Sequence, residues 1–140
     1  RIHYTILKNQ LHDPLLLFSA HAVPQYQINN GDTYEHAILK SSELIANSLK
    51  LPFKVAFQSK IGKMKWLEPS TEFVLKELIS SKHREIVIVP IAFLTENLET
   101  LYDIDIEIIP KFKDDFRLVK ASLDNSETEC AGMFFEILRN

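Results

Sequence analysis

The chain has 140 residues, of which 46% are hydrophobic and 25% charged, and its formal net charge is −3. This composition is average for a soluble globular protein and excludes a disordered, collagen-like or coiled-coil chain. The length suits one domain, and a mildly acidic chain lacks the basic face of nucleic-acid-binding proteins. The longest apolar run, Leu15–Phe18, is far shorter than the ~20 residues that span a bilayer, so no integral membrane segment is expected.

Four short apolar runs predict β-strands. The runs are Leu15–Ser19, Lys54–Phe57, Ile86–Val89 and Phe116–Val119. The first three are almost continuously apolar, as in strands that are buried on both faces of a parallel sheet. The fourth is the weakest, because charged Arg117 and Lys120 interrupt it.

Helical patterns separate these runs. Asp32-Thr33-Tyr34-Glu35 is spaced like a capping box and opens an apolar stripe of 3.6-residue period that reaches Leu49. A second helix is expected from Pro69-Ser70, and a last one from the capping box Ser126-Glu127-Thr128-Glu129. The stretch Arg1–Leu11 suits the tail of a helix. Since the chain begins with Arg1 and shows no signal-peptide pattern, we expect a processed chain or an excised piece.

Strands that alternate with helices predict parallel βαβ units. We therefore expect a single α/β domain over residues 1–140, with a doubly wound, mainly parallel four-stranded sheet and helices on both faces. Such sheets place their sites in the loops that follow the carboxyl ends of the strands. The loops in question are residues 20–31, 58–69, 90–107 and 121–125.

Two of these loops contain single residues of chemical interest. His21 directly follows the first strand, where a histidine suits proton transfer or, when neutral, metal ligation. A histidine that only hydrogen-bonds backbone in a turn is an equally good interpretation. Trp66, in the second loop, suits stacking on a flat ligand, but an aromatic plug at the edge of the core is the commoner case.

The third loop is unusually acidic. It contains no Lys or Arg before Lys111, and its acidic residues are Glu96, Glu99, Asp103, Asp105 and Glu107. On a helix, Glu99, Asp103 and Glu107 would share one face, where like charges repel by roughly 0.2–0.5 kcal/mol per pair. Such a ladder suits a divalent cation, which prefers hard oxygen ligands. The plainer interpretation is the solvated side of a packed helix.

Several other chemistries lack the residues they need. The remaining histidines show no paired metal-binding spacing and are expected at the surface; they are His3, His12, His36 and His83. Cys130, the single cysteine, falls on the apolar face of the last expected helix, which indicates a small buried hydrophobe and excludes an internal disulfide. With three glycines, the chain has neither a glycine-rich phosphate loop nor a G-x-S-x-G elbow.

Taken together, the loops resemble those of ferrochelatases, the enzymes that insert ferrous iron into a porphyrin in heme biosynthesis. The segments that carry the resemblance are Leu16-Leu17-Phe18-Ser19-Ala20-His21 with Pro24, Gly31-Asp32 with Tyr34, Phe57-Gln58-Ser59-Lys60-Ile61-Gly62 with Trp66-Leu67 and Pro69-Ser70-Thr71, Val89-Pro90-Ile91-Ala92-Phe93, and Leu98-Glu99-Thr100-Leu101-Tyr102-Asp103-Ile104-Asp105. Two departures are Ala22, where Gly or Ser is usual, and Asn97, where many relatives have His.

The resemblance implies roles for individual residues. His21 and Glu99 would be catalytic, facing each other across the porphyrin, and both would bind the metal together with Asp103. Asp103 would belong to an acidic path in a segment that is often wound as a π-helix. Residues expected to bind the porphyrin or to lie just behind the site are Tyr34, Ser59, Trp66 and Asn97. No resident cofactor is implied, because ferrous iron (Fe²⁺) is a substrate, with protoporphyrin IX or coproporphyrin III as the other.

The family's full chain is longer, with two similar α/β halves around the porphyrin, and this chain resembles the C-terminal half. We therefore expect the N-terminal half as a partner, and a cytoplasmic location with or without peripheral attachment to a membrane. Two alternatives stay open: an isolated, non-catalytic porphyrin-binding fragment, and a related cobalt or sirohydrochlorin chelatase.

Overall fold

A four-stranded parallel sheet forms the centre of the molecule. The computed structural model describes residues 1–60 and 62–123. Its strands are β1 (Leu15–His21), β2 (Phe53–Gln58), β3 (Glu85–Pro90) and β4 (Arg117–Lys120). They lie in the order β2-β1-β3-β4, and every neighbouring pair is parallel. The predicted parallel α/β sheet is therefore confirmed.

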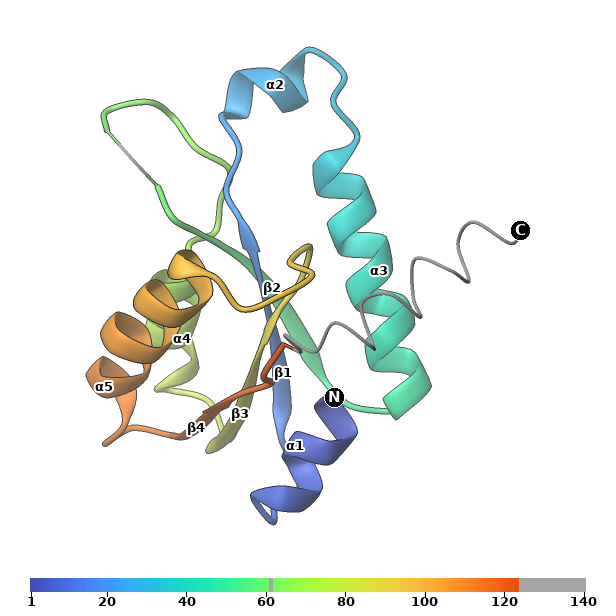
Figure 1. Cartoon of the computed structure of the whole chain (residues 1–140), viewed down its shortest axis with the longest axis vertical. Helices are drawn as coiled ribbons and strands as arrows, with labels where there is room; N and C mark the ends of the chain where they lie inside the picture. Colours follow the sequence, from blue (N-terminus) through green and yellow to red (C-terminus); the bar gives the residue numbers. More distant parts are fainter. Residues whose placement is uncertain (61, 124–140) are drawn as a thin grey trace.

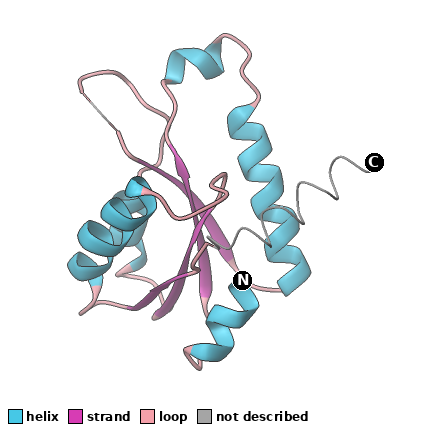
Figure 2. Ribbon diagram, in the orientation of Figure 1, coloured by secondary structure: helices cyan, strands magenta, loops and turns pink. Residues whose placement is uncertain are grey.

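Helices cover both faces of this sheet (Figures 1 and 2). One face carries α1 (Ile2–Lys8) and α3 (Tyr34–Leu49). The other face carries α4 (Thr71–Leu78), the π-helix η1 (Thr100–Ile108) and α5 (Ile109–Phe112). The short α2 (Gln25–Asn29) lies beyond the end of β1. In Figure 1 the sheet accordingly separates α4 and α5 from α1 and α3. This is the doubly wound arrangement that the alternating strand and helix patterns predict.

Alternating side chains of β1 divide the core in two. Leu15 and Leu17 pack in the cluster that includes α4 and η1, whereas Leu16 and Phe18 pack with α1 and α3. All four side chains are at most 3% exposed. Because both faces of the sheet are covered, both sets of residues must be apolar, which explains the continuous apolar runs in the sequence.

The strands extend further than the apolar runs alone indicate. β1 continues past Ser19 because Ala20 and His21 still pair with Phe57 and Gln58 of β2. Likewise, β4 includes Lys120, which pairs with Ile88 of β3. Polar residues at the carboxyl end of the sheet thus belong to the rigid strands rather than to the loops.

The expected helix starts agree with the structure at α4 and are shifted at α3. Ser70 caps α4, since its Oγ accepts a hydrogen bond from the Phe73 amide at 3.2 Å. At α3 the N-cap position is Thr33, while Asp32 Oδ1 accepts from the Tyr34 amide at 2.8 Å. The expected N-terminal helix tail is α1, whereas the last expected helix, with Cys130, lies outside the described residues. Within residues 1–60 and 62–123, no helix has the length and apolar character needed to cross a membrane.

Candidate active site

A large cavity opens where the carboxyl end of β2 meets α4 and η1. Its volume is about 960 Å³, and residues that line it include Gln58, Ser59, Thr71, Phe73, Glu99 and Asp103. Much of its rim is apolar, because three large hydrophobic side chains line it and are exposed. Their exposed fractions are 79% for Leu98, 53% for Phe73 and 47% for Tyr102. The cavity therefore offers apolar surface beside carboxylates, at the edge where a parallel sheet places its sites.

His21 and Glu99 meet at this edge. His21 Nδ1 lies 3.2 Å from Glu99 Oε2, and the two side chains are 35% and 44% exposed. The distance is that of an ion pair, but the geometry is not that of a hydrogen bond, and Nδ1 has no hydrogen-bond partner within the described part of the chain. An imidazole nitrogen beside a carboxylate can exchange a proton with a ligand or share a cation with its neighbour.

Tyr34 supports the strand end that carries His21. Its hydroxyl donates a hydrogen bond to the His21 carbonyl oxygen at 3.0 Å. Burial and, to a smaller extent, the negative charge of Glu99 raise the pKa of Tyr34 above its ordinary value of 10.0. The phenol therefore stays protonated near neutral pH and keeps donating this bond.

The acidic ladder lies along one side of the cavity. Glu99, Asp103 and Glu107 all line it, as the expectation of a shared face requires. Asp103 Oδ2 accepts a hydrogen bond from Ser59 Oγ, across from the end of β2. The segment is wound as the π-helix η1, as the resemblance implied; such helices are frequent at functional sites.

The structure brings only two of the three expected metal ligands together. Among residues 1–60 and 62–123, no group of three or more His, Cys, Asp or Glu side chains is arranged to hold a metal ion. His21 and Glu99 form a pair, while Asp103 is engaged with Ser59. Within the described part of the chain, Asp103 therefore does not join His21 and Glu99 in one metal-binding group.

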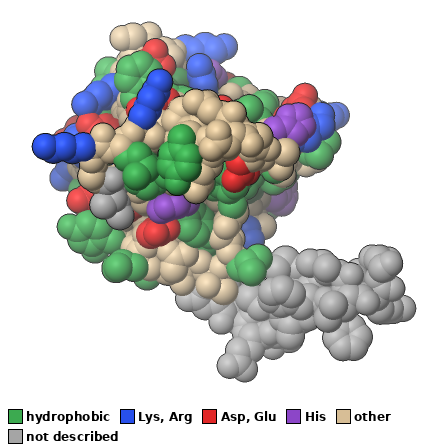
Figure 3. Space-filling view, turned by 90° about the horizontal axis from the view of Figure 1, so that it is seen from above, with side chains coloured by type: hydrophobic (Ala, Val, Ile, Leu, Met, Phe, Trp, Pro, Cys, Tyr) green, Lys and Arg blue, Asp and Glu red, His purple; other side chains and the backbone are tan. Residues whose placement is uncertain are grey.

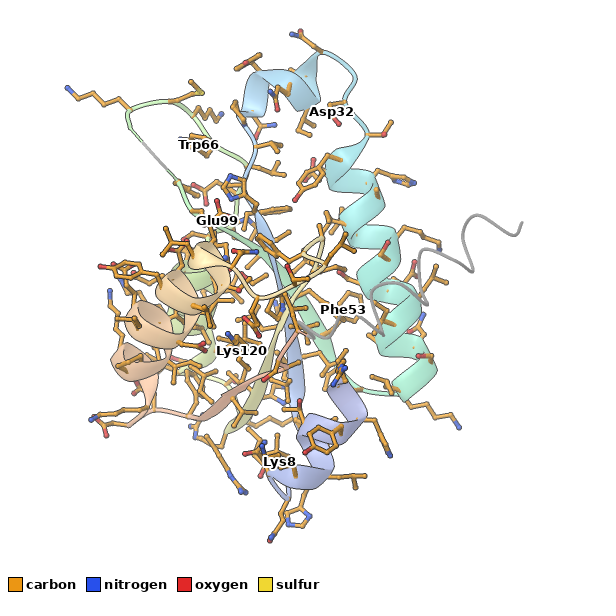
Figure 4. The ribbon with its side chains drawn as sticks, viewed as in Figure 1. Lys8, Asp32, Phe53, Trp66, Glu99 and Lys120 are labelled. Atoms are coloured by element: carbon orange, nitrogen blue, oxygen red, sulfur yellow. The ribbon has the colours of Figure 1, made fainter. Side chains whose placement is uncertain are left out.

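Trp66 packs at the edge of the core. It lies partly buried against a cluster that includes Ala20, Phe57 and Leu67, and it forms an isolated bridge with Pro24. Figure 4 shows it in the loop beyond Glu99. This position fits the plainer interpretation of an aromatic plug, and a porphyrin contact of its ring stays a prediction.

Asn97 acts on the backbone that carries Glu99. Its Oδ1 accepts hydrogen bonds from the amides of Glu99 at 2.9 Å and Thr100 at 3.2 Å. This is how a capping side chain satisfies the first amides of a helix. Asn97 therefore caps the helical turn of Leu98 and Glu99 that leads into η1.

Sequence reasoning missed an ion network around the buried side chain of Lys120, beside η1. Lys120 Nζ lies 2.9 Å from Glu96 Oε2 and 2.5 Å from Asp105 Oδ2. Burial pulls the pKa of Glu96 upward, but hydrogen bonds from Lys120, Thr100 and the Leu123 amide outweigh it and hold that pKa below its ordinary value. The only signal in the sequence was a lysine that interrupts an apolar run.

A second missed network joins three elements under the cavity. Ser19 Oγ donates to Gln58 Oε1 at 2.5 Å and lies 2.9 Å from Thr71 Oγ1, and all three residues are buried. Gln58 Nε2 has no hydrogen-bond partner within the described residues. The network ties β1, β2 and the start of α4 together at the floor of the cavity.

Comparison with known proteins identifies the family. The family model described as Ferrochelatase matches residues 1–140. The chain belongs to the ferrochelatase family. Similar curated relatives are the ferrochelatases of Geotalea uraniireducens (41% identical over 70% of this chain and 31% of the relative), Rickettsia prowazekii (38% over 81% and 35%) and Aquifex aeolicus (41% over 64% and 29%). The chain spans about a third of the length of these relatives.

One face of the chain carries side chains of several chemical types. Viewed from above, Figure 3 shows histidine and acidic side chains next to hydrophobic and neutral ones, with several Lys or Arg side chains toward the upper left of the view. A ligand bound at this face would therefore contact apolar surface and ionisable groups at the same time.

Proposed function

We propose that this chain is the metal-side half of an enzyme that inserts ferrous iron into a porphyrin in heme biosynthesis. The observation that carries the proposal is the His21–Glu99 pair, with 3.2 Å between Nδ1 and Oε2 at the edge of an apolar-rimmed cavity. A porphyrin is a flat apolar ring with a polar centre, and this combination of surfaces suits it. Membership of the ferrochelatase family supports the same reaction.

The chemistry requires two proton acceptors and a divalent cation. Metal insertion releases two pyrrole protons, and the four ring nitrogens then bind the metal. His21, through an imidazole nitrogen, accepts one proton. Glu99 accepts the other, or it holds the incoming ion while the second proton passes to water. Because both side chains are partly exposed, the protons pass on to solvent. The ring supplies the remaining metal ligands, so a pair of protein residues suffices.

Asp103 and Glu107 deliver the metal in this proposal. Both line the cavity on the side of η1, and carboxylate oxygens are hard ligands that attract divalent cations. Iron is then a substrate and no resident cofactor is required. Trp66 and Tyr34 complete the porphyrin side, and the N-terminal half of the enzyme closes the cleft in a cytoplasmic setting, with or without peripheral membrane attachment.

Zinc insertion into protoporphyrin, followed by fluorescence, tests the proposal. The chain is assayed alone and fused to the N-terminal part of the Geotalea uraniireducens relative. In the fused enzyme, His21→Ala and Glu99→Gln should each lower kcat by about 100-fold or more, the usual size of an acid–base contribution. His36→Ala, at an exposed position of α3, is the matched control and should leave the rate unchanged. Full activity of His21→Ala would contradict the assignment.

Asn97, at a position where many relatives have His, favours one second candidate, a porphyrin-binding fragment without turnover. In that case neither the chain nor the fusion inserts metal, although both bind protoporphyrin. The remaining alternative, a cobalt or sirohydrochlorin chelatase, predicts faster insertion of Co²⁺ into sirohydrochlorin than of Fe²⁺ into protoporphyrin IX or coproporphyrin III. The same fused enzyme distinguishes these outcomes.

A further inference from the structure

Lys120 is a buried cation at the carboxyl end of β4, outside the lining of the large cavity. Its side chain is only 7% exposed. Nζ donates hydrogen bonds to Glu96 Oε2 at 2.9 Å, to Asp105 Oδ2 at 2.5 Å and to the Thr100 carbonyl oxygen at 3.1 Å. An ammonium group has three donors, so these acceptors satisfy it completely.

Two of these acceptors come together because η1 is a π-helix. Thr100 and Asp105 lie five positions apart, which is the spacing of the backbone groups that hydrogen-bond in a π-helix. In an α-helix the Thr100 carbonyl would point to Ile104 instead, and Asp105 would lie about 100° further round the helix axis. The contacts of Lys120 therefore favour the π winding over the α winding.

The same contacts hold the start of η1. Thr100 is fully buried, and its Oγ1 donates to Glu96 Oε2 at 2.7 Å. Glu99, which faces His21, directly precedes Thr100 in the chain. Figure 4 shows Glu99 at one end of the helical segment and Lys120 lower down, between that segment and the sheet. Fixing Thr100 therefore fixes the backbone that carries Glu99.

We propose that Lys120 is a positioning residue that holds η1 in its π winding and thereby sets Glu99 opposite His21. This inference rests on the proposed function, because the carboxylate it positions is the one assigned to the metal and the pyrrole protons. It makes the site depend on β4, a strand at the edge of the sheet that contributes no residue to the cavity lining.

Zinc alone is the probe, measured by titration calorimetry on the 140-residue chain. Zn²⁺ binding that is lost in His21→Ala identifies the His21–Glu99 site. Lys120→Met should weaken this binding roughly tenfold, as is usual when a group behind a metal ligand is removed. It should also speed hydrogen exchange of the η1 amides. Lys40→Met is the matched control, because Lys40 pairs with Glu43 on the exposed side of α3, and it should change neither quantity.

A double variant separates positioning from stability. Removing Lys120 takes away an ion-pair partner of the Glu96 carboxylate, whose side chain is only 12% exposed, and this loss by itself destabilises the fold. In Lys120→Met with Glu96→Gln this charge is absent, so the unfolding temperature should recover. Zn²⁺ affinity and η1 exchange should stay impaired, because nothing bridges Thr100 and Asp105.

The outcomes distinguish the two proposals. If the double variant binds Zn²⁺ as tightly as the parent, Lys120 is only a counter-charge and the positioning role is wrong, while the function assigned to His21 stands. If His21→Ala binds Zn²⁺ as tightly as the parent, the assignment of the metal site itself is wrong. Weakened binding and faster η1 exchange in the double variant, with loss of binding in His21→Ala, support both.

Discussion

Replacing Asn97 by alanine tests whether one side chain secures the start of η1. Asn97 Oδ1 accepts from the amides of Glu99 and Thr100. Loss of a capping side chain costs about 0.5–2 kcal/mol. Thr100 is fully buried, so water cannot replace the lost bond, and the expected cost lies near the upper value of about 2 kcal/mol. With roughly 2.1 cal/mol/K of unfolding entropy per residue, a chain of this length loses about 7 °C in Tm.

Thermal unfolding followed by circular dichroism measures this change. Asn97→Asp keeps the acceptor oxygen and places a negative charge at a helix N-terminus, so it should retain most of the stability. Asn47→Ala, at an exposed position inside α3, is the control and should not lower Tm, because alanine is the better helix former. Equal Tm values for Asn97→Ala and Asn47→Ala would refute the capping role.

Three further predictions concern the core and the ionisable groups. Leu17→Ala empties a fully buried position and should cost about 2–5 kcal/mol in urea unfolding; a cost below about 1 kcal/mol would contradict the packing described. The pKa of Glu96 is held below its ordinary 4.5, so the ionised carboxylate stabilises the fold above that pH, and this stabilisation is lost as the pH falls through the folded-state pKa. The free energy of unfolding of Glu96→Gln should therefore fall less on acidification than that of the parent chain. Glu99→Gln should lower the pKa of Tyr34 but leave it above 10.0, because burial is the larger cause of the raised pKa. Ultraviolet titration, with Tyr34→Phe as the reference, measures this pKa. An unchanged pKa would exclude a direct influence of Glu99.

The strands were predictable because burial on both faces leaves a direct trace in the sequence. A short, continuously apolar run such as Leu15–Phe18 suits a strand that is buried on both faces. The ends were less predictable, since Ala20, His21 and Lys120 join the sheet through backbone pairing that any residue type can make. Strand order also rests on tertiary packing, which no local pattern reports.

The residues of the candidate site could be predicted only where they belong to a motif of the family. His21 and Glu99 lie far apart in the chain, and the resemblance, not their spacing, indicated that they meet. Asn97 was noted as a departure from the family, but its capping role needs the conformation of the following two residues. The burial of Lys120 depends on carboxylates from another segment, so the sequence showed only an interruption of a strand.

The central position of β1 has a consequence for how the molecule assembles. β1 pairs with β2 on one side and β3 on the other, and both partners are synthesised much later. Two large loops must therefore close before this pairing stabilises anything, which makes such parallel sheets slow to form. We therefore expect docking of the strand that ends in His21 to limit the refolding rate. A conservative change such as Phe18→Leu should slow refolding more than it speeds unfolding.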